Sequence, residues 1–115
     1  MSRRALRVWG CAVVLTVVGA APAAGAELYV ALGDSYSSGT GTREYYDSGC
    51  QRSNYSYAKI IDVERANTDV VLAACSGAKT GDVTATQVNS LTTGTRWVTI
   101  TIGGNDAGFS SVITE

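Results

Sequence analysis

Residues 28–35 have the sequence Leu28-Tyr29-Val30-Ala31-Leu32-Gly33-Asp34-Ser35, an apolar run that ends in a small, polar turn. Short apolar runs that stop at a glycine are typical of strands buried on both faces of a sheet. The acid and the hydroxyl that follow directly would lie at the carboxyl end of such a strand. The stretch therefore predicts a buried strand with reactive side chains at its end.

The rest of the chain alternates between strand and helix patterns. Two further strands are expected, over 70–74 and 97–102. Helices are expected over 55–67, 82–91 and 106–114, and loops over 35–49 and 75–81. Asn54 is a plausible cap of the first helix, and Asp106 would complement the positive end of the last one. This order predicts an α/β domain with a parallel sheet between two helical layers.

Each predicted strand ends in a cluster of small and polar residues. The clusters are Gly33-Asp34-Ser35, Cys75-Ser76-Gly77 and Gly103-Gly104-Asn105-Asp106. Because ligands of parallel sheets bind outside the carboxyl ends of the strands, these clusters predict a functional crevice at one edge.

One group in each cluster suits acyl-transfer chemistry. The Ser35 hydroxyl could act as a nucleophile if a base accepted its proton. The backbone N–H of Gly77 and the amide of Asn105 could donate to an oxyanion. Each residue also suits a plainer role, since Asp34 could cap a turn and Gly77 and Asn105 are common turn residues.

The composition excludes several classes of function. The 115 residues include 9 Lys and Arg, 10 Asp and Glu, and no His, for a net charge of −1. This charge argues against a nucleic-acid binder. Without histidine, an imidazole base within this chain and histidine-based metal sites are excluded, and we expect neither a metal nor a cofactor.

Residues 1–26 have the pattern of a secretory signal peptide. Arg3, Arg4 and Arg7 precede an apolar stretch, and Ala24-Gly25-Ala26 matches a cleavage site. The apolar stretch is shorter than the roughly 20 residues that span a bilayer, so no transmembrane segment is expected after cleavage. An uncleaved anchor or a core segment is the alternative. We expect a secreted domain over 27–115.

The cysteines fit export. Cys11 would leave with the signal peptide, and Cys50 and Cys75 would remain as an even pair in an oxidising compartment. A disulfide between them is expected; two free buried thiols are the alternative.

Taken together, the clusters resemble the sequence blocks of the SGNH (GDSL) hydrolases. Three segments carry the resemblance, and they are Tyr29–Gly39, Ala74–Val83 and Thr101–Phe109. They look most like the secreted actinobacterial lipases and esterases of that family, over essentially all of 27–115.

The resemblance implies a flavodoxin-like fold in which the three strands are neighbours in the order 2-1-3. It implies Ser35 as the acylated nucleophile, and an oxyanion hole formed by the N–H groups of Ser35 and Gly77 with the Asn105 side chain. It also implies that Cys50 and Cys75 form the first disulfide of that branch.

The family's histidine, in a late Asp-x-x-His block, has no counterpart here. We therefore expect the N-terminal, incomplete portion of a secreted serine hydrolase that acts on a small-molecule or lipid ester, with the chain as given inactive. Lys79 is the only conceivable base, and Tyr36, Tyr45 and Tyr46 are candidates for an acyl site.

Two other functions stay open, and the oligomeric state is not predicted. A non-catalytic binding module or pseudoenzyme would keep the crevice without the reaction. A flavodoxin-type phosphate binder would use the loop over 37–42, although this loop lacks a full phosphate-loop motif.

Overall fold

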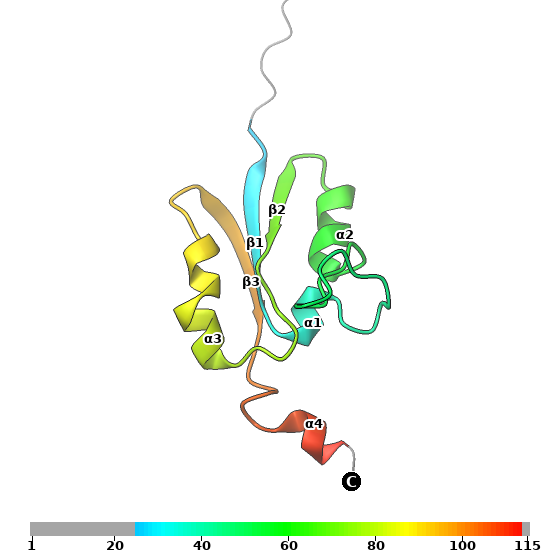
Figure 1. Ribbon diagram of the computed structural model, residues 1–115. Coiled ribbons are helices and arrows are strands. Elements are labelled where there is room, and N and C mark those ends of the chain that lie inside the picture. The colour runs from blue at the N-terminus through cyan, green and yellow to red at the C-terminus, as the bar shows by residue number, and fades with distance from the viewer. Residues whose placement is uncertain (1–24, 114–115) are drawn as a thin grey trace, which may run out of the picture.

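The computed structural model describes residues 25–113, so most of the predicted signal segment lies outside the described residues. The elements, drawn in Figure 1, are β1 (Glu27–Gly33), α1 (Ser35–Ser38), α2 (Tyr57–Glu64), β2 (Thr68–Leu72), α3 (Thr80–Ala85), the 3₁₀ helix η1 (Gln87–Ser90), β3 (Thr95–Thr101) and α4 (Phe109–Val112). None of the helices within 25–113 has the length and apolar character needed to cross a membrane.

The strands form a parallel sheet of three, and β1 lies in its middle. The order is β2-β1-β3, as predicted. β1 pairs with β2 from Glu27–Thr68 to Ala31–Leu72, and with β3 from Leu28–Thr95 to Gly33–Thr101. The last residue of β1 therefore lies beside the last residue of β3.

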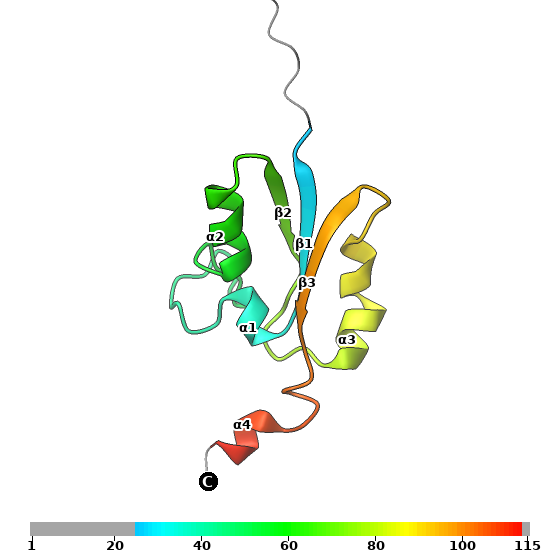
Figure 2. The same ribbon diagram turned by 180° about the vertical axis from the view of Figure 1, so that it is seen from behind.

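Helices cover both faces of the sheet, which confirms the predicted three layers. Figures 1 and 2 show α1 and α2 on one face and α3 on the other. Alternate β1 residues face opposite sides. Tyr29 and Ala31 pack in the cluster on the α2 side, whereas Val30 and Leu32 pack with Val83 of α3. All four are buried, which explains why this part of the strand is apolar on both faces.

The expected starts of the first two helices are wrong. Residues 35–38 form the helix α1 and not a loop, because the buried Asp34 carboxylate accepts the Tyr36 N–H at 3.1 Å and caps the first turn. The left-handed Gly39, with φ of 100°, then ends the helix. The next helix, α2, starts after Ser56, so Asn54 is not its cap.

The two later helices also differ from expectation. The segment over 82–91 is divided into α3 and η1, because Thr86 between them has a non-helical backbone. The last helix starts only after Gly108, whose φ is 70°. Asp106 therefore does not cap α4, and it binds Thr80 of α3 instead.

The long connection between α1 and α2 is fixed to the end of β2. Cys50 and Cys75 form the predicted disulfide, with Cα atoms 4.3 Å apart. The guanidinium of Arg52 donates to the carbonyls of Ala73 and Ala74 and pairs with Asp47 at 2.8 Å. The Cys50 N–H, more than the Arg52 charge, holds the pKa of Asp47 below its usual value.

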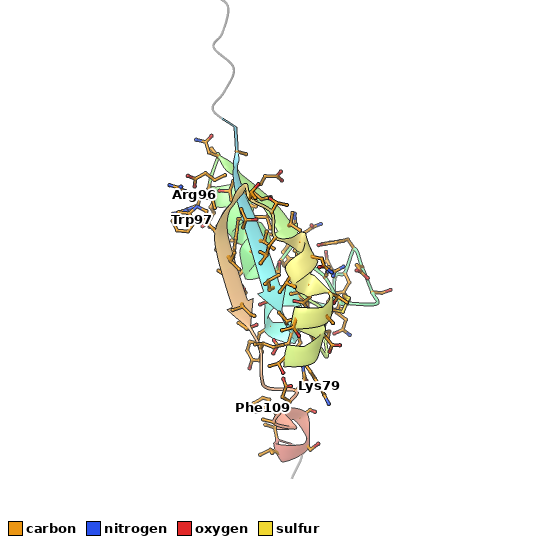
Figure 3. The ribbon with its side chains drawn as sticks, turned by 90° about the vertical axis from the view of Figure 1, so that its left-hand side faces the viewer. Lys79, Arg96, Trp97 and Phe109 are labelled. Carbon is orange, nitrogen blue, oxygen red and sulfur yellow. A yellow bond between two sulfur atoms is a disulfide. The ribbon has the colours of Figure 1, made fainter. Side chains whose placement is uncertain are left out.

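The two ends of the sheet differ in character. Figure 3 shows Arg96 and Trp97 at the amino end of β3, and Lys79 and Phe109 at the carboxyl end of the sheet. At the amino end the half-exposed Trp97 donates to the Glu27 carboxylate at 2.7 Å, and Arg65 lies over its ring. The candidate catalytic groups gather at the opposite end.

Replacing both Cys50 and Cys75 by serine should lower the free energy of unfolding by about 3.5 kcal/mol, because the bridge restricts the unfolded chain. Denaturant unfolding followed by circular dichroism measures the change. As a control, alkylation of the unreduced protein should leave both cysteines unmodified. Two alkylated cysteines in the folded chain would contradict the bridge.

Candidate active site

Ser35 is the first residue of α1 and directly follows the turn that ends β1. Its side chain is partly buried, and its hydroxyl makes no hydrogen bond to any residue that the structure describes. The Asp34 cap fixes the first turn of α1 on which Ser35 stands. The serine is thus held by its backbone while its hydroxyl stays available.

The turn before Ser35 passes unusually close to β3. Gly33 has a φ of 129°, and a Cβ at this position would overlap the carbonyl oxygen of Thr101. The next peptide also binds there, since the Asp34 N–H donates to that carbonyl at 2.9 Å. Only glycine allows this approach.

A second contact fixes the same turn, and it comes from Gln87 of η1. Its buried side chain accepts the Gly33 N–H at 2.7 Å and donates to the Gly33 carbonyl at 2.9 Å. Sequence reasoning missed this residue, because one glutamine in a weakly helical segment carries no signal of a contact 54 positions away.

Asn105 and Asp106 tie the third loop to the second. The Asn105 amide donates to the carbonyl of Ala78 at 2.9 Å, which leaves one of its two N–H groups free for another acceptor. Asp106 accepts from both the hydroxyl and the N–H of Thr80. These two hydrogen bonds, the hydroxyl first, lower the pKa of Asp106.

Ser35 and Asn105 line one hollow of about 520 Å³. Asp34 and Thr101 also belong to its lining, and its apolar part is made by Tyr36, Ile102, Phe109 and Ile113. Of the residues predicted for an acyl site, Tyr36 is therefore present. Tyr45 and Tyr46 line a separate hollow with Tyr55.

Two other predicted residues are not part of the lining of this hollow. Gly77 is exposed, with φ of 82°, and its N–H makes no hydrogen bond within residues 25–113. It lines a neighbouring hollow and precedes Ala78, the partner of Asn105. Lys79 is exposed directly before α3, at the carboxyl end of the sheet (Figure 3). It does not line the hollow of Ser35.

Two further features concern metal and phosphate binding. Among the residues that the structure describes, no group of three or more His, Cys, Asp or Glu side chains could hold a metal ion. Ser37 and Ser38 are fully buried, and their hydroxyls bind neighbouring groups of the protein. The hydroxyls of Ser37 and Ser38 are therefore not open to a phosphate, whereas Thr40 and Gly41 are exposed.

Comparison with known proteins gives a consistent family. The model of the GDSL-like lipase/acylhydrolase family matches residues 31–115. The chain is 50% identical to a lipase from Streptomyces rimosus over 96 residues, which are 82% of this chain and 36% of that protein. It is 46% identical to Lipase 1 of Streptomyces coelicolor over 97 residues, again 36% of the relative.

Solved structures agree. The extracellular lipase of Streptomyces rimosus matches with a TM-score of 0.72 and 50% identity, over 77% of this chain and 39% of that one. Phospholipase A1 from Streptomyces albidoflavus matches with a TM-score of 0.71 and 44% identity, over 78% of this chain and 39% of that one. The chain spans little more than a third of the length of these relatives.

Gly33→Ala should lower the free energy of unfolding by more than about 2 kcal/mol, because the new Cβ meets the Thr101 backbone at a positive φ. The matched control is Gly81→Ala in α3, where a Cβ meets nothing within 4 Å. This control should raise stability by about 0.4–1 kcal/mol. Equal effects of the two changes in thermal unfolding would refute the close approach at Gly33.

Proposed function

The chain belongs to the GDSL-like lipase/acylhydrolase family, and from that premise we propose that it supplies the nucleophile and the oxyanion hole of a secreted serine ester hydrolase. One observation carries the proposal: the unengaged Ser35 hydroxyl and the Asn105 amide line the same hollow. This hollow lies at the carboxyl edge of the sheet, where ligands of such folds bind.

In the proposed reaction the Ser35 oxygen bonds to the carbonyl carbon of the ester while its proton passes to a base. The carbonyl oxygen becomes an oxyanion, and the bond to the alcohol then breaks as the alcohol takes up the proton. Water releases the acyl group from Ser35 by the same two steps. The negative charge develops only in the transition state, so donors aimed at it accelerate the reaction.

The oxyanion hole would consist of the Ser35 and Gly77 N–H groups and the Asn105 amide. Neither backbone N–H donates to a group in the described part of the chain, so both are available. The hydrogen bond from Asn105 to Ala78 supports its role, because it orients the amide and leaves a second N–H. It also joins Asn105 to the loop that carries Gly77.

The base must come from outside these residues. The chain contains no histidine, and Lys79 does not line the hollow of Ser35. The family resemblance implies the imidazole of a late Asp-x-x-His block. These residues by themselves would therefore bind and orient an ester without hydrolysing it at an appreciable rate.

The apolar side of the hollow favours esters with an apolar acyl chain. Tyr36, Ile102, Phe109 and Ile113 provide that side. The names of the relatives, lipase and phospholipase A1, agree with a lipid-like substrate. Secretion is supported by the signal-like residues 1–26 and by the disulfide, which is typical of exported proteins.

The test uses an extended version, in which residues 27–115 are joined to the C-terminal part of the Streptomyces rimosus lipase. Steady-state hydrolysis of a short-chain ester should be abolished by Ser35→Ala. Asn105→Ala should lower kcat about 10²- to 10³-fold with a much smaller change in KM, since its donor acts on the transition state.

Asn54→Ala is the matched control, because Asn54 is exposed and outside the hollow. It should leave kcat unchanged, and circular dichroism should confirm that every variant folds. If folded Asn105→Ala keeps a near-normal kcat, Asn105 is a turn residue and not an oxyanion donor. An extended version that binds esters without turnover would favour the binding-module alternative.

A second test uses the chain of 115 residues as it stands. We expect no substantial turnover of the same ester, because Ser35 has no imidazole to accept its proton. Clear turnover that disappears in Ser35→Ala would reveal a base within these residues and refute the proposed division of roles.

A further inference from the structure

Five side-chain hydroxyls form a continuous hydrogen-bonded chain that ends next to Ser35 in the sequence. They come from β1, α1, α2 and β3, and the chain ends at the carboxylate of Asp34. In order, the bonds are Tyr29–Thr99 at 2.8 Å, Thr99–Tyr57 at 3.0 Å, Tyr57–Ser37 at 3.0 Å, Ser37–Thr101 at 2.7 Å and Thr101–Asp34 at 3.1 Å.

The number of protons fixes the direction of every bond in this chain. A carboxylate only accepts, so the hydroxyl of Thr101 donates to Asp34. The one proton of the Thr101 hydroxyl is used in this bond, so Ser37 must donate to Thr101. The Ser37 proton is then used as well, so Tyr57 must donate to Ser37. Thr99 then donates to Tyr57 and Tyr29 to Thr99, which places all five O–H groups in one direction.

An aligned chain of this kind strengthens its last bond. Each hydroxyl that donates becomes a better acceptor and each that accepts becomes a better donor, so the bonds polarise one another. Ser37 and Tyr29 are buried, whereas Tyr57, Thr99 and Thr101 are partly buried, so water is kept from the two buried members of the series. A tyrosine hydroxyl is protonated near neutral pH, so Tyr29 can act as the first donor; burial moves its pKa further upward.

The chain ends on the atom that fixes the nucleophile's turn. Oδ1 of Asp34 accepts both the Thr101 hydroxyl and the Tyr36 N–H. Without the Thr101 hydroxyl the carboxylate would lose one of these two contacts and could rotate away from the first turn of α1. Ser35 lies between Asp34 and Tyr36, so its hydroxyl and its N–H would move with that turn.

We propose that these five hydroxyls form a positioning chain for the nucleophile, in which Thr101, Ser37, Tyr57, Thr99 and Tyr29 act on Ser35 through Asp34. The inference rests on the proposed function of Ser35. The chain links the packing of α2 on the sheet to the orientation of a serine that none of its distant members touches. A merely structural role would be served as well by apolar side chains of the same shape.

The test compares single-hydroxyl deletions in the extended version. Thr101→Val should lower kcat about tenfold and leave KM within about twofold, because a hydrogen bond to a charged group is lost. Thr101→Ser keeps the hydroxyl and should restore kcat. Tyr57→Phe, three bonds from Asp34, should lower kcat about threefold, because the remaining bonds weaken.

Tyr55→Phe is the matched control, since Tyr55 is exposed and its hydroxyl lies outside the chain. It should leave kcat unchanged. Amide hydrogen exchange provides a readout that does not depend on turnover, and the Tyr36 N–H should exchange faster in Thr101→Val and Tyr57→Phe only. If Thr101→Val fails to fold, Tyr57→Phe decides by both readouts.

The outcomes separate this inference from the proposed function. Folded Thr101→Val or Tyr57→Phe with unchanged kcat overturns the positioning role, as does a Thr101→Ser variant that is as slow as Thr101→Val. If the extended version hydrolyses no ester at all, the proposed function fails. The exchange rate of the Tyr36 N–H is then the one remaining test of whether the hydroxyls position the first turn of α1. Unchanged exchange in both deletion variants then overturns the positioning role.

Discussion

The close contact between the backbones of Gly33 and Thr101 is the constraint on which the carboxyl edge of the sheet depends. The ends of β1 and β3 meet there with no side chain between them, and the Asp34 N–H binds the Thr101 carbonyl. Ser35 lies two residues after Gly33, so this contact fixes its position. Gln87 holds Gly33 from one side of the sheet, and the hydroxyl of Thr101 holds Asp34 from the other.

The other two loops are fixed by contacts between segments that are distant in the sequence. Asn105 binds Ala78, Asp106 binds Thr80, and the Cys50–Cys75 bridge joins the end of β2 to the long connection after α1. These contacts link segments that are 25 to 27 positions apart in the chain. Loops joined in this way can hold donors and a nucleophile in a constant relation, which electrostatic stabilisation of a transition state requires.

The two faces of β1 are covered in different ways. On the α3 side Val30 and Leu32 meet aliphatic side chains, whereas on the α2 side Tyr29 combines an apolar ring with a hydroxyl bound to Thr99. An apolar core could hold α2 equally well. The hydroxyls between α2 and β3 have a function beyond packing if they act on Asp34, which accepts the last hydrogen bond of the series.

The α/β class, the three strands and the positions of the polar clusters could be predicted from the sequence alone, because apolar runs and the residues that end them are local patterns. The even cysteine count after the predicted signal peptide also predicted the disulfide. Helix boundaries were less predictable: the cap at Asp34 and the left-handed Gly108 depend on backbone geometry that composition does not specify. Three features depend on the folded structure: Gln87 binds Gly33, Asp106 binds Thr80, and a hydrogen-bonded series of five hydroxyls reaches Asp34. No local pattern marks which serine, threonine, tyrosine or glutamine will be bound, because their roles arise from partners that only folding brings within hydrogen-bond distance.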